Sequence, residues 1–249
     1  EDDSGDPDGN GHVNLKYTYL GSQELHTLEY TVKLYPGEVN LLTEVNDHVL
    51  FATDSGYGQQ MFYNLTTHEL MPVGGTSSPY SIGHVNNRWY VSGYPSTQVY
   101  EYDFSRPLGL RQAEPNPRRV VYLGREIDAH TPLGGTVGAA DGRVYCGSIT
   151  YGRRRDGGGF GWCDPKTGEM GGIQSTHRFF WMTTADNGRY VLASTKATDG
   201  GNGKLFCWDT QVGKIIYEKE ILDRPTPGPI TEAMPGGLII GHTTAPEAD

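Results

Sequence analysis

The amino-acid sequence predicts an all-β fold, and three observations support this prediction: the composition, the chemistry of the turns and a repeat of strand-like segments. The chain has 249 residues, of which 35 are Gly, 15 are Pro and 16 are Tyr, while only 36% are hydrophobic. This composition suits many short strands joined by tight turns. No segment has the apolar spacing of a convincing amphipathic helix.

A strand motif occurs five times along the chain and narrows the fold class. Each copy begins with a turn-forming residue, continues with a hydrophobic or aromatic run and has a small residue near its end. The copies are DHVLFAT from Asp47, NRWYVSG from Asn87, GRVYCGS from Gly142, GRYVLAS from Gly188 and GGLIIGH from Gly236. Their starts lie about 40, 55, 46 and 48 residues apart, which is the length of one blade in a β-propeller.

A second series of segments follows the first four copies and completes a four-stranded unit: MFYNLTTHEL, VYEYDFSRPL, FGWCDPKTGEM and LFCWDTQVGKI. The turns at residues 164–169 and 209–214 supply the Asp and Gly that hairpins need. A polar or small-residue segment precedes each motif and supplies an inner strand. The sequence therefore predicts a β-propeller of four-stranded antiparallel blades over residues 13–249, after an acidic linker or calcium loop at residues 1–12.

Over roughly residues 40–245, these motifs resemble bacterial β-propeller repeat proteins with WD- or kelch-like blades and YDPKTGK-type turns. The resemblance implies an architecture and no particular chemistry, because propellers host lyases, hydrolases, oxidoreductases and interaction platforms alike. Four blades are complete in the sequence, and the N-terminal strands at residues 13–34 would complete a fifth with the last motif. The alternative is a piece of a larger propeller.

Charge, hydropathy and cysteine spacing exclude several functions. A net charge of −10 disfavours nucleic acid as a partner, since that affinity comes mainly from clustered Lys and Arg. No apolar run approaches the roughly 18–20 residues that a membrane span needs. Cys146, Cys163 and Cys207 lack the CxxC spacing of zinc and redox sites, and their strand-like surroundings predict buried thiols.

The repeat register gathers scattered residues at one end of the propeller. The loops between the second and third strands of each blade, and those between blades, meet at this end, where a rigid scaffold typically carries binding residues. The predicted site residues on these loops are Tyr57, Tyr94, Tyr151, His130, His177, His242, Arg153, Arg154 and Arg155. The three tyrosines occupy comparable positions in successive blades, as aromatic residues that stack on sugar rings would. The alternative is that they cover the ends of the hydrophobic core, as aromatic residues near strand ends often do.

Arginines and histidines give this end its predicted chemistry. Guanidinium forks suit bidentate binding of carboxylate or sulfate, so Arg153, Arg154 and Arg155 are predicted to hold an acidic group. The alternative is a solvated hairpin in which arginine pairs with Asp156. His130 and His177 lie in equivalent loops on either side, and with Tyr151 they supply candidate base and acid groups for elimination next to a sugar carboxylate. A single histidine is also often structural.

The sequence therefore predicts a carbohydrate-active propeller that acts on an acidic glycan, in the manner of a uronate-type polysaccharide lyase. Its catalytic residues would be His130, His177 and Tyr151, and its substrate-binding residues Arg153, Arg154, Arg155, Tyr57, Tyr94 and His242. The alternative is a non-catalytic propeller that binds a partner protein or a glycan. We expect an extracellular or periplasmic location, with an acidic oligo- or polysaccharide or a protein as partner.

The N-terminal segment contains a candidate calcium loop. Asp6, Asp8 and Asn10 provide oxygens at alternating positions before Gly11, and Asn14 follows at the ninth position, so these four residues are the predicted ligands. Tyr17 replaces the bidentate Glu of an EF-hand. The segment instead resembles an FG-GAP-type loop, which a strand follows. The alternative is a flexible acidic linker.

Overall fold

The computed structural model describes residues 10–17, 24–33, 39–46, 49–54, 60–73, 79–109, 116–128, 130–150, 157–198, 201–220, 230–234 and 238–241. The chain divides into two compact units, Glu1–Glu38 and Val39–Asp249, and each is described by itself. In the first unit, β1 (Asn10–Tyr17) pairs antiparallel with β2 (His26–Lys33). The strands expected before residue 34 are therefore present as a hairpin.

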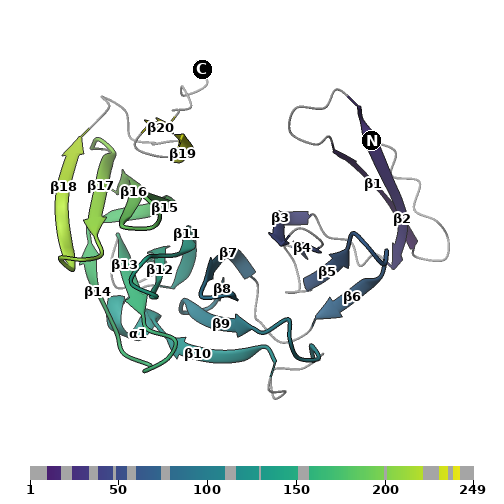
Figure 1. The fold of residues 1–249 in the computed structure, drawn as a ribbon. Helices are drawn as coiled ribbons and strands as arrows, with labels where there is room; N and C mark the ends of the chain where they lie inside the picture. Colours follow the sequence, from purple (N-terminus) through teal and green to yellow (C-terminus); the bar gives the residue numbers. More distant parts are fainter. Residues whose placement is uncertain are drawn as a thin grey trace. The chain divides into compact units, whose positions relative to one another are not determined.

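The second unit contains four antiparallel sheets of four strands, each built from consecutive strands (Figure 1). Their bounds are, for blade 1, β3 (Val39–Asn46), β4 (Val49–Asp54), β5 (Gln60–Asn64) and β6 (Leu70–Val73); for blade 2, β7 (Pro79–Val85), β8 (Arg88–Gly93), β9 (Gln98–Tyr102) and β10 (Arg118–Tyr122); for blade 3, β11 (Thr131–Gly138), β12 (Val144–Ile149), β13 (Gly158–Cys163) and β14 (Met170–Ser175); and for blade 4, β15 (His177–Ala185), β16 (Tyr190–Ala197), β17 (Lys204–Asp209) and β18 (Lys214–Glu220).

The first strands of neighbouring blades lie next to one another, since β11 contacts both β7 and β15. Aromatic side chains fill the space between blades 3 and 4, where Phe160 of β13 contacts Phe179, Phe206 and Trp208 of blade 4. Sheets of four antiparallel strands that pack face to face around their first strands define a β-propeller. The predicted fold class is confirmed.

The five copies of the sequence motif all form strands, namely β4, β8, β12, β16 and β20 (Leu238–Gly241). The last of these pairs with β19 (Ile230–Met234) in a sheet of two strands. Four complete blades are thus present among the described residues. Completion of a fifth blade by β1 and β2 stays a prediction, because the two units are described separately.

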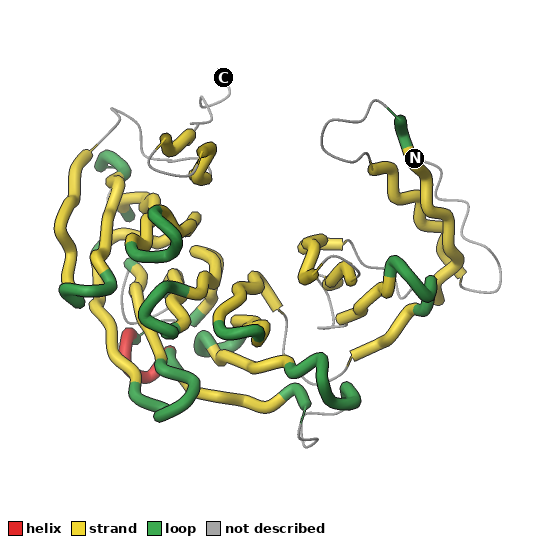
Figure 2. The backbone as a smooth tube through the Cα atoms, viewed as in Figure 1, coloured by secondary structure: helices red, strands yellow, loops and turns green. Residues whose placement is uncertain are grey.

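The predicted turns have the expected chemistry. In the turn after β13, the Asp164 carboxylate accepts a hydrogen bond from the backbone N–H of Lys166 at 2.8 Å, and Gly168 has φ of 76°. The turn after β17 repeats this arrangement, with Asp209 and with Gly213 at φ of 69°. Figure 2 shows these connections as short green segments between strands. Asp and Gly therefore fix the ends of the outer hairpins.

One helical turn, α1 (Gly124–Ile127), lies between β10 and β11 and is absent from the sequence-based expectation (Figure 2). It packs on β13 and β14 at positions where the sheet has no side chains. A Cβ on Gly172 would lie 2.3 Å from Cγ2 of Ile127, so only glycine leaves room for the helix there. Among the described residues, no helix has the length and apolar character that a membrane span requires.

A hydroxyl triangle connects blades 2 and 3. The Ser81 hydroxyl lies 2.8 Å from that of Ser92 and 2.6 Å from that of Thr136, and Thr136 donates to Ser92 at 2.6 Å. Ser92 and Thr136 are buried, so these contacts satisfy polar groups that water does not reach.

Candidate functional site

Strands alternate in direction within a blade, so the connections β8–β9, β10–β11, β12–β13, β14–β15 and β16–β17 all lie at one end of the sheets. We refer to it as the loop end. Hydrogen bonds join these connections from blade to blade. The Thr198 hydroxyl, for example, donates to the carbonyl oxygen of Thr176 at 3.0 Å. The loop end of blades 2 to 4 is therefore one continuous surface.

Two predicted site residues from different loops are in contact at this surface. The rings of Tyr94 and His130 meet edge-on, with centroids 4.7 Å apart and an interplanar angle of 86°. The carbonyl oxygen of His130 also accepts hydrogen bonds from the backbone N–H groups of Ser96 at 2.7 Å and Thr97 at 3.3 Å. Tyr94 remains 38% exposed, so its side chain is accessible to a ligand.

The loop that contains the three arginines begins and ends beside both predicted histidines. Its flanking residues are joined by a hydrogen bond from Thr150 N–H to the Gly157 carbonyl oxygen at 2.8 Å. On one side, His130 N–H donates to the carbonyl oxygen of Ile149 at 3.0 Å. On the other, a Cβ on Gly158 would lie 3.0 Å from the His177 carbonyl oxygen. The segments of His130 and His177 thus flank the base of this loop.

Several predicted residues lie outside the described residues, namely Tyr57, Tyr151, Arg153, Arg154, Arg155, His242, Asp6 and Asp8. Asn10 and Asn14 lie on β1, opposite Lys33 and Glu29 of β2. Within the described part of the chain, no group of three or more His, Cys, Asp or Glu side chains could hold a metal ion. The calcium site and the roles of these residues stay predictions.

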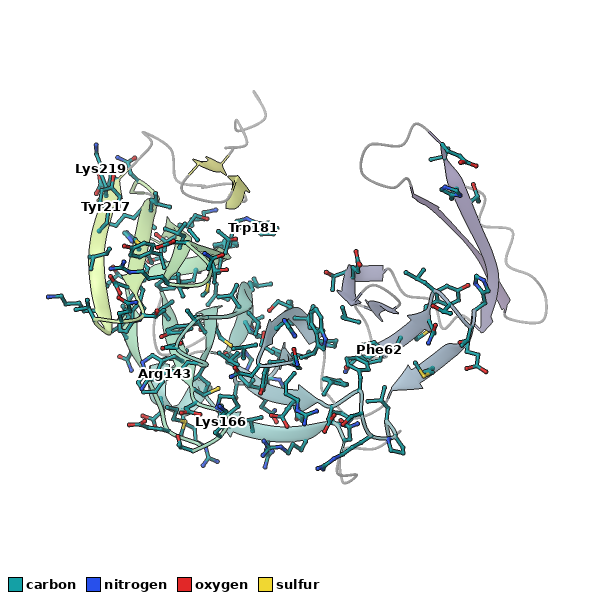
Figure 3. The ribbon with its side chains drawn as sticks, viewed as in Figure 1. Phe62, Arg143, Lys166, Trp181, Tyr217 and Lys219 are labelled. Carbon is teal, nitrogen blue, oxygen red and sulfur yellow. The ribbon has the colours of Figure 1, made fainter. Side chains whose placement is uncertain are left out.

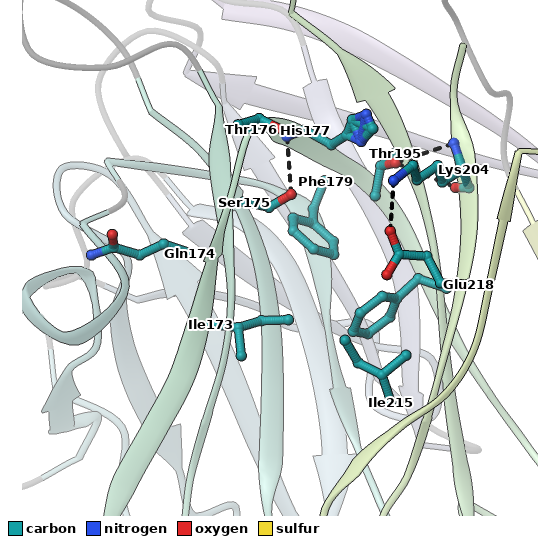
Figure 4. Close-up of a pocket in the computed structure, with 11 residues that line it drawn as sticks. Ile173, Gln174, Ser175, Thr176, His177, Phe179, Thr195, Lys204, Ile215 and Glu218 are labelled. Carbon is teal, nitrogen blue, oxygen red and sulfur yellow. Dashed lines mark hydrogen bonds and ion pairs between the residues drawn. The ribbon is translucent and has the colours of Figure 1, made fainter. Parts of the chain in front are cut away.

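A pocket of about 380 Å³ lies at the loop end between β14 of blade 3 and the sheet of blade 4 (Figure 4). His177 is part of its wall, together with the polar side chains of Ser175, Thr195, Lys204 and Glu218. The apolar side of the pocket is formed by Ile173, Phe179, Phe206 and Ile215. It thus combines charged and hydrogen-bonding groups with a hydrophobic surface, as small-molecule sites do.

The charged groups of the pocket form an ion pair. The Lys204 ammonium donates to Oε1 of Glu218 at 2.7 Å, and both side chains are partly exposed. The backbone N–H of Lys204 donates to the Thr195 hydroxyl at 3.2 Å, while His177 N–H donates to the Ser175 hydroxyl at 3.0 Å. These bonds hold the polar side chains of two blades at one rim.

Thr195, Lys204 and Glu218 are not among the site residues predicted from the sequence. In the structure Glu218 lies on the outer strand β18, opposite Phe206 of β17. Trp181, which is 47% exposed on the inner strand β15, was also missed. Figure 3 shows it on the opposite side of blade 4 from Tyr217 and Lys219 of β18. The positions of these side chains on the sheet depend on the register between neighbouring strands, and the sequence alone does not give that register.

Comparisons with known proteins agree with this fold. No protein-family model matches the sequence, and no curated protein matches it either. Among solved structures, Kuenenia stuttgartiensis hydrazine synthase is similar with a TM-score of 0.53 and 14% identity, over 74% of this chain and 49% of that one. A Myceliophteria thermophila Cps50 (Swd1) β-propeller domain has a TM-score of 0.54 and 13% identity, over 78% of this chain and 59% of that one.

A streptogramin B lyase has a TM-score of 0.55 and 15% identity, over 91% of this chain and 70% of that chain. This chain spans about half of the hydrazine synthase chain and about three fifths of the Cps50 domain chain. At such identities the likeness shows the fold alone. The fold and the comparisons together define the chain as a β-propeller. The similar structures include two enzymes, the synthase and the lyase, and one propeller domain whose printed name gives no activity.

Proposed function

We propose that this propeller binds an acidic oligo- or polysaccharide at the loop end of blades 2 to 4. One observation carries the proposal: the base of the arginine loop, at Thr150 and Gly157, lies between the segments of His130 and His177. The loop that carries Arg153, Arg154 and Arg155 starts and ends on the same surface as the exposed ring of Tyr94. Arginine forks bind carboxylates bidentately, and an aromatic side chain offers a sugar an apolar surface.

The glycan assignment rests on matching chemistry. The chain has a net charge of −10, but its three consecutive arginines make this loop locally positive. A positive loop favours an anionic ligand over a neutral one. Such a ligand is expected outside the cytoplasm, so an extracellular or periplasmic location belongs to the proposal. The calcium loop at the N-terminus belongs to it as well, and a higher melting temperature on addition of Ca²⁺ is the result expected for it.

Lyase activity is a second candidate, favoured by the segments of His130 and His177 on either side of the base of the arginine loop. Elimination from a uronate requires a base that removes the proton next to the carboxylate. A cation stabilises the negative charge that develops, and an acid protonates the leaving oxygen as the glycosidic C–O bond breaks and a C=C bond forms. His177 would supply the base or the acid, and an arginine of the loop would supply the cation. His130 lies on the other side of the arginine loop.

Calorimetric titration with uronate polymers and neutral polymers tests the binding proposal. Losing a charge-assisted contact costs about 1.5–3 kcal/mol, so Arg153→Ala should weaken binding of the uronate polymer by roughly ten- to hundredfold. Lys166→Ala is the matched control, because Lys166 lies in the exposed turn between β13 and β14, at the opposite end from the loop end. Equal binding of neutral and uronate polymers, or no binding of either, contradicts the proposal.

The lyase candidate has a separate test. Wild-type protein, His130→Ala and His177→Ala are incubated with the polymer that binds, and the ultraviolet absorbance of the unsaturated product is followed. A lyase should lose turnover much more than affinity in at least one histidine variant. Binding without any unsaturated product from the wild-type protein leaves a non-catalytic glycan-binding propeller and rejects the enzyme.

A further inference from the structure

We propose that the pocket between β14 and blade 4 binds a free α-amino acid with an apolar side chain. This site goes beyond the glycan-binding surface, because it is formed by Lys204, Glu218 and the aromatic side chains between the blades. The ligand class follows from three properties of the pocket: a pair of opposite charges, an apolar floor and a small volume.

The charged wall of the pocket matches a zwitterion. Lys204 and Glu218 present an ammonium and a carboxylate 2.7 Å apart, at side-chain exposures of 30% and 43%. The ammonium and carboxylate of an α-amino acid are also close together, since one carbon carries both. Such a ligand can place its carboxylate on Lys204 and its ammonium on Glu218, which pairs all four charges. A ligand with one charge leaves either Lys204 or Glu218 without a new partner.

The pocket also has an apolar wall, which adjoins the ion pair because Phe206 is the cross-strand partner of Glu218. Phe179 and Phe206 are almost fully buried, at 1% and 4% exposure, and their rings contact each other at 5.7 Å between centroids. Ile173 and Ile215 extend this surface (Figure 4). Polar sugar hydroxyls would find few partners here, whereas an aliphatic or aromatic side chain gains by leaving water. This wall selects for leucine, isoleucine, methionine or phenylalanine over glycine and over a sugar.

The size and the remaining polar groups fit a single amino acid. A volume of about 380 Å³ lies at the lower end of the roughly 300–1,000 Å³ of small-molecule sites. The Ser175 hydroxyl accepts a hydrogen bond from His177 N–H, so its own O–H can donate to a ligand carboxylate oxygen. Ser175 therefore adds a hydrogen-bond donor to the two charged groups of the pocket.

Calorimetric titration of the whole chain with amino acids and their derivatives tests this site. Leucine or phenylalanine should bind, while N-acetyl-leucine lacks the ammonium and leucinamide lacks the carboxylate, so each should bind about ten- to hundredfold more weakly. Glycine should bind weakly because it has no side chain. Failure of both leucine and phenylalanine to bind overturns the proposal, as does tighter binding of galacturonate to the same pocket.

Two variants locate the binding. Glu218→Gln should reduce the affinity for leucine about tenfold or more while leaving that for N-acetyl-leucine unchanged, because the derivative has no ammonium to pair. Lys219→Ala is the control, since Lys219 is the next residue on β18 and lies outside the pocket. An unchanged leucine affinity in a folded Glu218→Gln variant overturns the site. Uronate binding should not respond to Glu218→Gln, and leucine binding should not respond to Arg153→Ala, so the two proposals fail independently.

Discussion

The ring of Tyr94 meets the ring of His130 edge-on at 4.7 Å, and this contact joins the loop after β8 to the connection before β11. The two residues are 36 positions apart in the sequence, yet the repeat register alone predicts that their loops share one end. The contact also limits how each ring can serve a ligand. The edge of one ring is occupied by the other, so the exposed part of Tyr94 is what remains for binding.

We expect Tyr94→Ala to lower the free energy of unfolding by about 0.5–1.5 kcal/mol, because the variant loses an edge-to-face aromatic pair. Tyr94→Phe keeps the ring and should stay close to the wild type. Urea unfolding followed by fluorescence measures both variants. If the two variants are equally destabilised, the phenolic hydroxyl and not the ring contact stabilises this loop.

Gly172→Ala should destabilise the fold by about 1–3 kcal/mol, the usual cost of adding a methyl group to a packed core. Its Cβ would lie 2.3 Å from Ile127 Cγ2 and 2.5 Å from the carbonyl oxygen of Phe160 on β13, so both α1 and the pairing of β13 with β14 must shift. Urea unfolding of Gly172→Ala, Ile127→Ala and the double variant gives the coupling energy. We expect the double variant to be less destabilised than the sum of the two single variants. Strict additivity would show that α1 does not press on this glycine.

The turn after β13 should make stability depend on pH. Hydrogen bonds from the backbone N–H groups of Lys166 and Thr167 hold the pKa of Asp164 below its ordinary value of 3.8. Because the folded pKa is lowered, the stabilisation is fully present above pH 3.8 and is lost as the pH falls through the folded pKa. Urea midpoints at acidic pH should therefore fall less steeply in Asp164→Asn than in the wild type. Parallel curves for the two proteins would contradict this.

The three cysteines should be inert in the folded protein. All three are free and buried, as the sequence predicts, and burial raises the pKa of Cys146 to about 12. The thiolate is the reactive form, so a thiol reagent should modify none of them near neutral pH and all three in urea. Mass spectrometry of the labelled protein counts the modified residues. Fast labelling of any one of them under native conditions would show that its blade opens locally.

The sequence predicts the strands and turns of this protein well, because each depends on a few adjacent residues. The strand β12 follows from a hydrophobic and aromatic run that ends in small residues, and the turn at Asp164 follows from the position of its carboxylate and glycine. The helix α1 could not be predicted in this way. It has only four residues, so it carries no periodic pattern of its own. It also needs room to pack against the sheet, and that room comes from glycines in another part of the sequence, such as Gly172.

The candidate site could be predicted only as far as the repeat register extends. The register places His130 and His177 on either side of one loop, and the structure agrees. The pocket depends on how β14 packs against the sheet of blade 4 and on the pairing of Lys204 with Glu218 across β17 and β18. Those relationships arise from tertiary packing, and no local sequence signal marks them.

The hydroxyl triangle of Ser81, Ser92 and Thr136 has a consequence for how the propeller opens. Separation of blades 2 and 3 breaks both contacts of the Thr136 hydroxyl at once, so the buried hydroxyls of Ser92 and Thr136 each lose a partner, while the Ser81–Ser92 contact lies within blade 2. Repeats usually open one after another, as nearest neighbours in a row. Here the backbone amides of β7, β8, β11 and β12 should exchange their hydrogens with heavy water in a single step, so that these two blades behave as one cooperative folding unit.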